Sequence, residues 1–263
     1  METKRKIILA AALVLCFSVQ PLFAEGGLRV LATNSWTAAY AKAAGVEDVE
    51  MLAPSDMVHP PEYELLPTDV KKVNEADLLI YAGYEVLMKS VFESFDKPEE
   101  ELVKIQTGYD PELMRIAVMN IAGRTGTCSE ALVSLEEIDG FFESARSDLR
   151  DRGLYGAPVL VHFHQRPLAE ALGFEILGIF GPMPMEAGQL RKLGGLEPRF
   201  IIDNAHNPIA APLEEITGAP AAELINFPGL YNRGESGDTM SLIGVLRYNR
   251  SQLLADDFLS RIE

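Results

Sequence analysis

The sequence predicts an α/β protein of two lobes, each a parallel-sheet α/β sandwich, joined by a long rigid helix. Two observations lead to this fold class. Short apolar runs alternate with helical patterns in both halves of the chain, and such alternation is typical of parallel sheets covered by helices. Between the halves, one uninterrupted helical stripe is present. We expect an N-terminal lobe at 25–128, a linking helix at 129–152 and a C-terminal lobe at 153–263.

The first lobe is predicted to contain four strands and three helices. A proline-rich loop at 54–67 interrupts the alternation, and Thr68 is placed to cap the helix after it. The predicted strands are 28–32, 49–52, 78–81 and 102–105, and the predicted helices are 36–44, 69–76 and 85–95.

The linking helix is predicted from its apolar spacing. Residues 129–152 contain no proline and a single glycine. Ser129 is placed to begin the helix and Gly153 to end it. Apolar residues recur at intervals of three and four, which marks one buried face: Leu132, Leu135, Ile138, Phe142, Ala145 and Leu149.

The alternation resumes in the second lobe. Gly218 is expected to end the helix that Pro208 begins. The predicted strands are 159–162, 174–180, 200–202 and 224–227, and the predicted helices are 168–172, 185–193, 208–217 and one that starts at 239.

Residues 1–24 have the pattern of a cleaved secretory signal peptide. Lys4, Arg5 and Lys6 precede an apolar run at 7–19, and Ala24 is a suitable last residue before cleavage. The run is short for a membrane-spanning helix, which needs ~20 residues, although an uncleaved anchor is the alternative. We therefore expect the mature protein to be periplasmic.

The charge balance excludes one class of partner. Lys and Arg number 23 against 39 Asp and Glu, a formal net charge of −16, so the basic surface that nucleic acid binding requires is not present. One cysteine, Cys128, lies beyond the predicted signal peptide, which excludes a cysteine-rich zinc site and a CxxC redox pair.

The four histidines follow predicted strands or lie in the loops beyond them: His59, His162, His164 and His206. Ligand sites of open α/β sheets lie outside the carboxyl ends of strands, and histidine is the commonest metal ligand among side chains. Asp203 also follows a strand, and Asp238 precedes the last helix, where it could cap the helix or bind a metal. Together these positions indicate a metal site.

The chain resembles the zinc/manganese-type periplasmic solute-binding proteins of metal ABC transporters, as a divergent member. The resemblance rests on an ordered series of segments: Val30-Leu-Ala-Thr33, Tyr63-Glu64 with Pro67-Thr68-Asp69, Glu75-Ala-Asp77-Leu78 with Gly83, His162 with Leu168-Ala169 and Gly173, Phe180 with Gln189-Leu190, and Gly237-Asp238 with Asn249. It implies capture of one divalent metal in the cleft between the lobes and its delivery to a membrane permease, by a monomeric protein that is not an enzyme and holds no organic cofactor.

The ligand set implied by the resemblance is His59, Glu112, His162 and Asp238. His162 and Asp238 match the family's motifs, whereas Pro61 stands where the first histidine is normal and Asp110-Pro111-Glu112 replaces the second histidine motif. His164, Asp203 and His206 are expected near the bound substrate, with Asp203 as a possible acceptor for a ligating imidazole.

The metal is expected to be Zn²⁺ or Mn²⁺, the transported ligand. Two nitrogens and two carboxylates favour manganese, and replacing Glu112 by His164 or His206 would favour zinc. Two alternatives remain: a binding protein for a small organic ligand or metal chelate on the same fold, and a secreted metal-dependent hydrolase, for which neither HExxH nor GxSxG is present.

Overall fold

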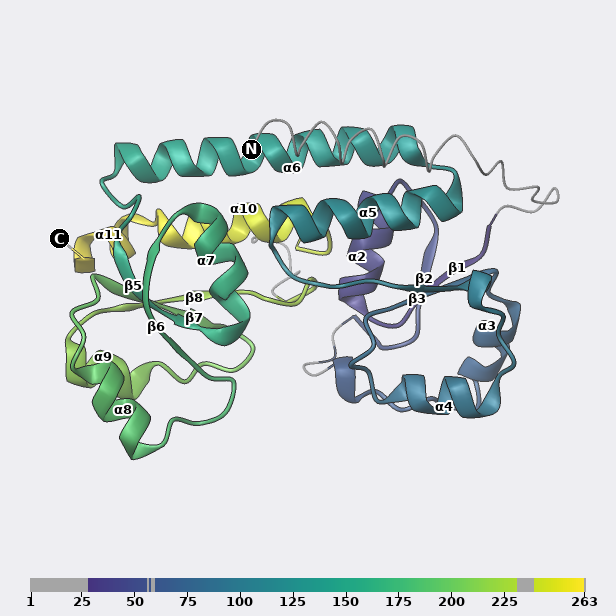
Figure 1. Cartoon of the computed structure of the whole chain (residues 1–263), viewed down its shortest axis with the longest axis horizontal. Helices are drawn as coiled ribbons and strands as arrows, with labels where there is room; N and C mark the ends of the chain where they lie inside the picture. Colours follow the sequence, from purple (N-terminus) through teal and green to yellow (C-terminus); the bar gives the residue numbers. More distant parts are fainter. Residues whose placement is uncertain (1–27, 56, 58–59, 231–238, 263) are drawn as a thin grey trace. The chain divides into compact units, whose positions relative to one another are not determined.

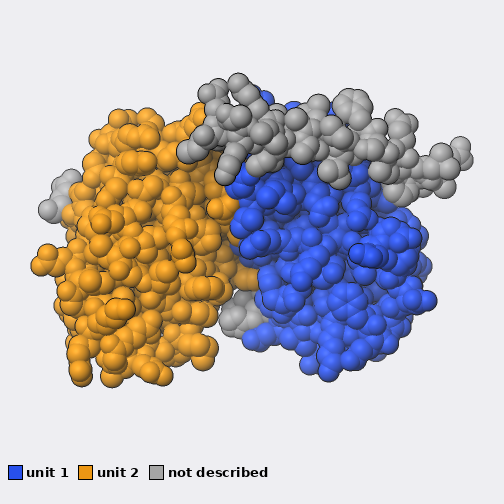
Figure 2. Space-filling model, viewed as in Figure 1, with its two compact units in different colours: residues 1–107, 112–136 blue, residues 108–111, 137–263 orange. Residues whose placement is uncertain are grey.

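The computed structural model describes residues 28–55, 57, 60–230 and 239–262 (Figure 1). The chain divides into two compact units: unit 1 comprises residues up to 107 and 112–136, and unit 2 comprises residues 108–111 and 137–263 (Figure 2). Each contains a four-stranded parallel sheet with helices, which confirms the predicted fold class. The predicted signal peptide lies outside the described residues.

Unit 1 is built around sheet A, in which all strand pairs are parallel. The strand order is β2-β1-β3-β4. The strands are β1 (Val30–Ala32), β2 (Val49–Met51), β3 (Leu78–Tyr81) and β4 (Leu102–Lys104), and the helices are α2 (Ser35–Ala43), α3 (Asp69–Glu75), α4 (Leu87–Ser94) and α5 (Pro111–Thr125), with short 3₁₀ turns at Pro60–Glu62 and Glu99–Glu101.

Alternation along the strands gives sheet A two apolar faces. Leu31 of β1 and Leu79 of β3 are register partners, and they pack with Val73 of α3 and Val91 of α4. Because successive strand residues point to opposite faces, Ile80 is directed to the other face, where α2 packs on the sheet. All five side chains are at most 2% exposed, and each such burial contributes roughly 1.5–3 kcal/mol.

Unit 2 repeats this plan around sheet B, with strand order β6-β5-β7-β8 and parallel pairs throughout. Leu160 of β5 and Ile201 of β7 are register partners and pack with Leu193 and Leu213. The strands are β5 (Pro158–His162), β6 (Glu175–Phe180), β7 (Phe200–Asn204) and β8 (Ala221–Leu224), and the helices are α7 (Arg166–Leu172), α8 (Ala187–Gly194), α9 (Ala211–Thr217), α10 (Leu242–Leu253) and α11 (Asp256–Ile262), with a 3₁₀ turn η3 (Phe163–Gln165).

The predicted linking helix is α6 (Cys128–Asp151), which has 24 residues. Its residues up to Glu136 belong to unit 1 and the rest to unit 2. The predicted stripe is buried except for Leu132, which is 37% exposed, and Ala131 is buried in its place. Among the described residues, no helix combines the length and the apolarity needed to cross a membrane.

Several elements differ from the sequence-based expectation. Strand β8 spans Ala221–Leu224 rather than 224–227, and α9 begins at Ala211 rather than at 208. Helix α5 was not predicted, although Met114, Ala117, Val118 and Ile121 have helical spacing and are buried. The helix predicted from residue 239 is α10, which begins at Leu242; its N-cap is Ser241, whose hydroxyl accepts the Gly244 N–H.

Asn249 ties α10 to the chain that follows β8. Its side-chain amide donates to the Ile225 carbonyl at 2.9 Å and its Oδ1 accepts the Ile225 N–H at 2.8 Å. Both residues are at most 1% exposed. The Asn249 side chain therefore pairs with the buried N–H and C=O of Ile225, which have no neighbouring strand in the described part of the chain to pair with them.

Replacing Asn249 by alanine is expected to lower the free energy of unfolding by about 2 kcal/mol or more, because two buried backbone groups lose their partners. Urea unfolding followed by far-UV circular dichroism measures the change. The matched control is S251A on the same helix, which removes only exposed hydrogen bonds. A stability of N249A within the error of that control would contradict the role assigned to Asn249.

Candidate functional site

The carboxyl ends of the strands of sheet B carry several buried polar side chains. Strand β5 ends at His162 and β7 ends at Asp203 and Asn204, and the two strands are adjacent in the sheet. Because all strands of a parallel sheet end at one edge, these residues meet there.

His162 is fully buried at this edge, with 0% exposure. Its Nδ1 accepts the backbone N–H of His164 at 3.2 Å. Its Nε2 is buried and has no hydrogen-bond partner among the described residues. Burial, with a smaller contribution from the nearby His164, lowers the pKa of His162 to about 4, so the imidazole is neutral at physiological pH.

Two rings pack against the imidazole, one from the turn after β5 and one from the end of β6. The His164 ring lies 5.3 Å from the His162 ring, centroid to centroid, and Phe180 at the end of β6 packs edge-on at 5.6 Å. His164 itself is exposed, and desolvation by the surrounding protein lowers its pKa. The β5–α7 turn therefore presents one buried and one accessible imidazole.

Gly181 lies against the buried imidazole. It follows β6 with φ +74, and a methyl group added there would lie 2.5 Å from Nε2 and 2.6 Å from Cδ2 of His162. Only a residue without a side chain fits this position, and the conformation itself favours glycine.

Gln165 holds the neighbouring strand ends together. It is fully buried, and its amide nitrogen donates to Asn204 Oδ1 at 3.2 Å and to the Leu224 carbonyl at 2.8 Å. Its Oε1, like His162 Nε2, lacks a partner among the described residues. Gln165 and Gly181 were not singled out from the sequence, and only their positions after strands could have indicated them.

Asp203 organises the loop after β7. One carboxylate oxygen accepts the Asn204 N–H at 2.8 Å, and the other accepts the Ile209 and Ala210 N–H groups at 2.8 and 2.7 Å. Burial raises the pKa of Asp203, and these three backbone donors oppose that shift. Both oxygens are thus engaged by backbone donors rather than by an imidazole.

His206 lies in the loop that Asp203 holds. Its Nδ1 is 3.5 Å from the Asn226 backbone nitrogen, and its ring packs against Phe227 at 5.6 Å. The Asn226 carbonyl accepts a hydrogen bond from Tyr109 at 3.1 Å. His206 therefore lies beside the chain that follows β8.

In sheet A, Glu85 lies beside the carboxyl ends of the strands. This buried carboxylate accepts the Thr33 hydroxyl at 2.6 Å and the Asn34 amide at 3.3 Å, and its two oxygens take the Ala82 and Gly83 N–H groups at 2.8 and 2.6 Å. It joins the ends of β1 and β3. The sequence suggested only a helix starting at Glu85, whereas α4 begins at Leu87.

The loop before α3 is closed by a second buried carboxylate. Asp69 Oδ2 accepts the Tyr63 hydroxyl at 2.7 Å and the Leu66 N–H at 2.9 Å. Burial, and then the hydrogen bond to Asp69, raises the pKa of Tyr63 to about 12. Tyr63 and Asp69 belong to the segment that resembles the family's first ligand loop.

The predicted metal ligands are only partly described. His59 and Asp238 lie outside the described residues, and Glu112 is exposed in the first turn of α5. Within residues 28–55, 57, 60–230 and 239–262, no group of three or more His, Cys, Asp or Glu side chains is arranged to hold a metal ion.

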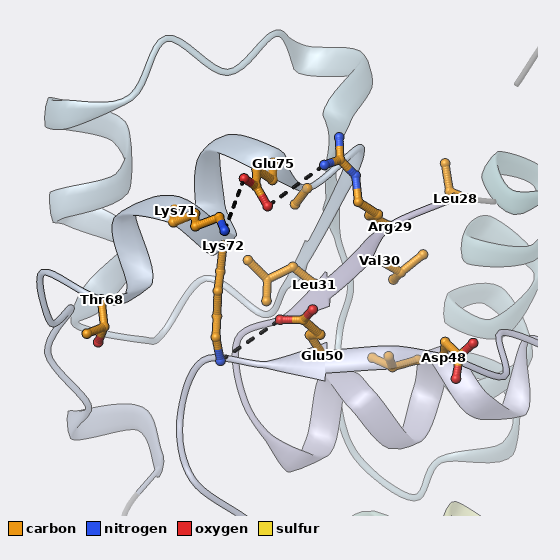
Figure 3. A pocket seen from close by; sticks show the side chains of 12 residues that line it. Leu28, Arg29, Val30, Leu31, Asp48, Glu50, Thr68, Lys71, Lys72 and Glu75 are labelled. Atoms are coloured by element: carbon orange, nitrogen blue, oxygen red, sulfur yellow. Dashed lines mark ion pairs between the residues drawn. The ribbon is translucent and has the colours of Figure 1, made fainter. Parts of the chain in front are cut away.

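A cavity of about 710 Å³ lies at the opposite, amino edge of sheet A (Figure 3). Its charged side chains pair with one another: Glu75 lies 3.8 Å from Lys71 and 4.0 Å from Arg29, and Lys72 lies 4.0 Å from Glu50. Because these charges are mutually compensated and the carboxyl edges carry the histidines, we place the candidate site at the carboxyl edge of sheet B.

Comparison with known proteins identifies the fold. No family model matches the sequence, and the curated proteins give no significant match. Among solved structures, the laminin-binding protein Lmb of Streptococcus agalactiae, a bifunctional protein with adhesin and metal transporting activity, matches with a TM-score of 0.62 and 17% identity over 90% of this chain and 100% of that chain.

Two further solved structures match most of this chain. The solute-binding protein FpvC of P. aeruginosa, in complex with Ni²⁺, has a TM-score of 0.62 and 14% identity over 90% of this chain and 97% of its own. AdcAII of Streptococcus pneumoniae has a TM-score of 0.63 and 16% identity over 86% of this chain and 97% of its own. The resemblance drawn from the sequence is thereby confirmed at the level of the fold, which is that of these metal-binding solute-binding proteins.

The buried imidazole makes stability depend on pH. A histidine has a pKa of about 6.5 in an unfolded chain, whereas that of His162 is about 4 in the folded protein. Between these values the unfolded chain binds a proton that the folded chain does not, so stability falls as the pH is lowered through this window. We expect His162 to account for a loss of roughly 3 kcal/mol between pH 7 and pH 4.

Urea unfolding of the wild type and H162Q at pH 7 and pH 4 measures this contribution. The wild type should lose more stability than H162Q by the stated amount. An equal pH dependence of the two proteins would show that His162 titrates normally.

Proposed function

We propose that this chain is an exported binding protein that captures a divalent transition metal, with His162 as a ligand. The observation that carries the proposal is the buried, neutral imidazole at the end of β5, whose Nε2 has no hydrogen-bond partner among the described residues. The fold supports it, since proteins that share this fold are known in complex with Ni²⁺, Mn²⁺ and Zn²⁺.

The electrostatics of His162 suit a metal ligand. A metal needs the lone pair of a neutral imidazole, and burial lowers the pKa of His162 to about 4. Protons therefore do not compete with a metal ion for this ring at neutral pH. Any change in metal affinity between pH 5 and pH 7 is therefore expected to come from the titration of other ligands, because His162 stays neutral over this range.

Metal capture at Nε2 must change the hydrogen bonding of the ring. Neutral imidazole has one N–H and one lone pair. While Nδ1 accepts the His164 N–H, the proton belongs on Nε2. A metal at Nε2 moves that proton to Nδ1, and the bond from His164 is then lost. We infer that capture is coupled to a rearrangement of the η3 turn.

We propose His59, Glu112 and Asp238 as the remaining ligands. His164 and His206 are proposed to lie near the bound ion, because both are at the same edge of sheet B as His162. Asp203 is proposed to act as a positioning residue, since its carboxylate holds the loop that carries His206.

The transported ion is proposed to be Zn²⁺ or Mn²⁺. Two imidazoles and two carboxylates accept either ion. We further propose a periplasmic, monomeric carrier that hands the ion to a membrane ABC permease. The proposal includes cleavage of the segment 1–24 and does not include a catalytic activity.

Equilibrium dialysis with elemental analysis tests the function. The wild type should retain one Zn²⁺ or Mn²⁺ per chain, and H162Q should lower the affinity by about 100-fold or more, since a lost ligand costs at least as much as a lost outer-shell partner. E112Q and D238N should each weaken binding. E170Q, which changes an exposed carboxylate on α7 that pairs with Arg166, is the matched control.

Two results would contradict the proposal: no metal retained by the wild type, or unchanged affinity in H162Q. An organic molecule that co-purifies with the wild type without metal would instead favour the small-molecule carrier. Circular dichroism of each variant checks that it is folded.

A further inference from the structure

We propose that residues 181–186 form a gate over His162, held closed by Asn207. This segment, the strap, joins β6 to α8. The inference rests on the proposed function, because it assigns to the strap the control of access to the proposed ligand His162.

The strap begins directly on the imidazole. Gly181 covers the Nε2–Cδ2 edge of His162, so closely that a methyl group there would lie 2.5 Å from Nε2. The nitrogen beneath has no hydrogen-bond partner among the described residues, and its own surface is buried. An ion cannot reach this nitrogen until part of its cover moves.

The strap is the part of that cover best able to move. Phe180, before it, is 0% exposed and packs in the core beneath sheet B, and Met185 packs against the same cluster. Between these two anchors, Pro182, Met183 and Pro184 are exposed, and Met183 is 74% exposed. Moving the middle of the strap therefore uncovers little apolar surface, whereas moving Phe180 would open the core.

One side-chain hydrogen bond of the described residues joins the strap to the neighbouring loop. Asn207 Nδ2 donates to the Pro182 carbonyl at 2.7 Å. Asn207 lies in the loop after β7 that the buried Asp203 fixes through the Ile209 and Ala210 N–H groups. The exposed middle of the strap is thus joined to a loop that Asp203 holds in place, by one side-chain hydrogen bond among the described residues.

Removing this bond should raise access to His162. The Asn207→Ala change deletes the donor. Asn207→Asp keeps the size of the side chain but presents a carboxylate that cannot donate to the Pro182 carbonyl. Each is expected to increase the open population about fivefold, the effect of losing one hydrogen bond.

Chemical modification of histidine measures access without any metal. Wild type, N207A and N207D are treated with diethyl pyrocarbonate at neutral pH, and the modification of each histidine is followed by peptide mass spectrometry. We expect slow modification of His162 in the wild type and about fivefold faster modification in both variants, with the rate at His164 unchanged. S260A, which removes an exposed hydrogen bond on α11, is the control and should match the wild type.

Two results would contradict the proposed gate. One is wild-type modification of His162 as fast as that of the exposed His164. The other is an unchanged His162 rate in both N207A and N207D.

Metal-binding rates separate this inference from the function on which it rests. Stopped-flow mixing with Zn²⁺ or Mn²⁺ should give faster association in N207A and N207D than in the wild type. Faster modification of His162 without metal binding by any of the proteins would sustain the gate and refute the metal carrier. Metal binding by the wild type with equal association rates in all proteins would refute the gate and sustain the carrier.

Discussion

The burial of one imidazole without a partner on Nε2 is the constraint on which the carboxyl edge of sheet B depends. A buried polar group that lacks a hydrogen bond costs roughly 1–3 kcal/mol relative to one that is paired. His162 reduces this cost by remaining neutral and by packing edge-on against Phe180. An apolar residue would fill the same space without that penalty, but it would leave the His164 N–H without the acceptor that Nδ1 provides.

The buried carboxylates of both units differ from His162 Nε2, because their oxygens have hydrogen-bond partners. Glu85, Asp69 and Asp203 each accept two or more hydrogen bonds from nearby donors, most of them backbone N–H groups. Their lone pairs are engaged in fixing loops at the ends of strands. The same edges therefore contain two kinds of polar group: carboxylates that build the loops, and an imidazole whose nitrogen is left without a partner among the described residues.

The fold could be predicted from the sequence because its signals are local. The alternation of short apolar runs with helical patterns requires parallel sheets, and the stripe of α6 follows from spacing alone. The missed helix α5 also has a clear stripe, but its first residues were interpreted as a ligand motif. The predicted start of α10 at residue 239 was wrong for a local reason. The Thr239 hydroxyl donates to the Leu230 carbonyl, and Ser241 caps the helix instead.

The site could be predicted only in part, because its decisive contacts join residues far apart in the chain. The position of His162 at a strand end follows from its sequence. The approach of Gly181 to its Nε2, and the bond from Asn207 to Pro182, depend on how β5, β6 and β7 pair. Asp203 illustrates the same limit. A carboxylate after a strand can accept a hydrogen bond from an imidazole or from the backbone of a loop. Only the three-dimensional arrangement shows that Asp203 accepts from three backbone N–H groups.

The tautomer of His162 links the gate to metal capture. In the described state, the His164 N–H occupies Nδ1 and Gly181 covers Nε2, so neither nitrogen is available. Binding at Nε2 requires both that Gly181 withdraw and that the proton move to Nδ1, which breaks the bond from His164. Both changes are required at the same ring. If the chain is the metal carrier proposed above, its apparent affinity equals the affinity of the open form multiplied by the fraction of molecules in which the ring is uncovered.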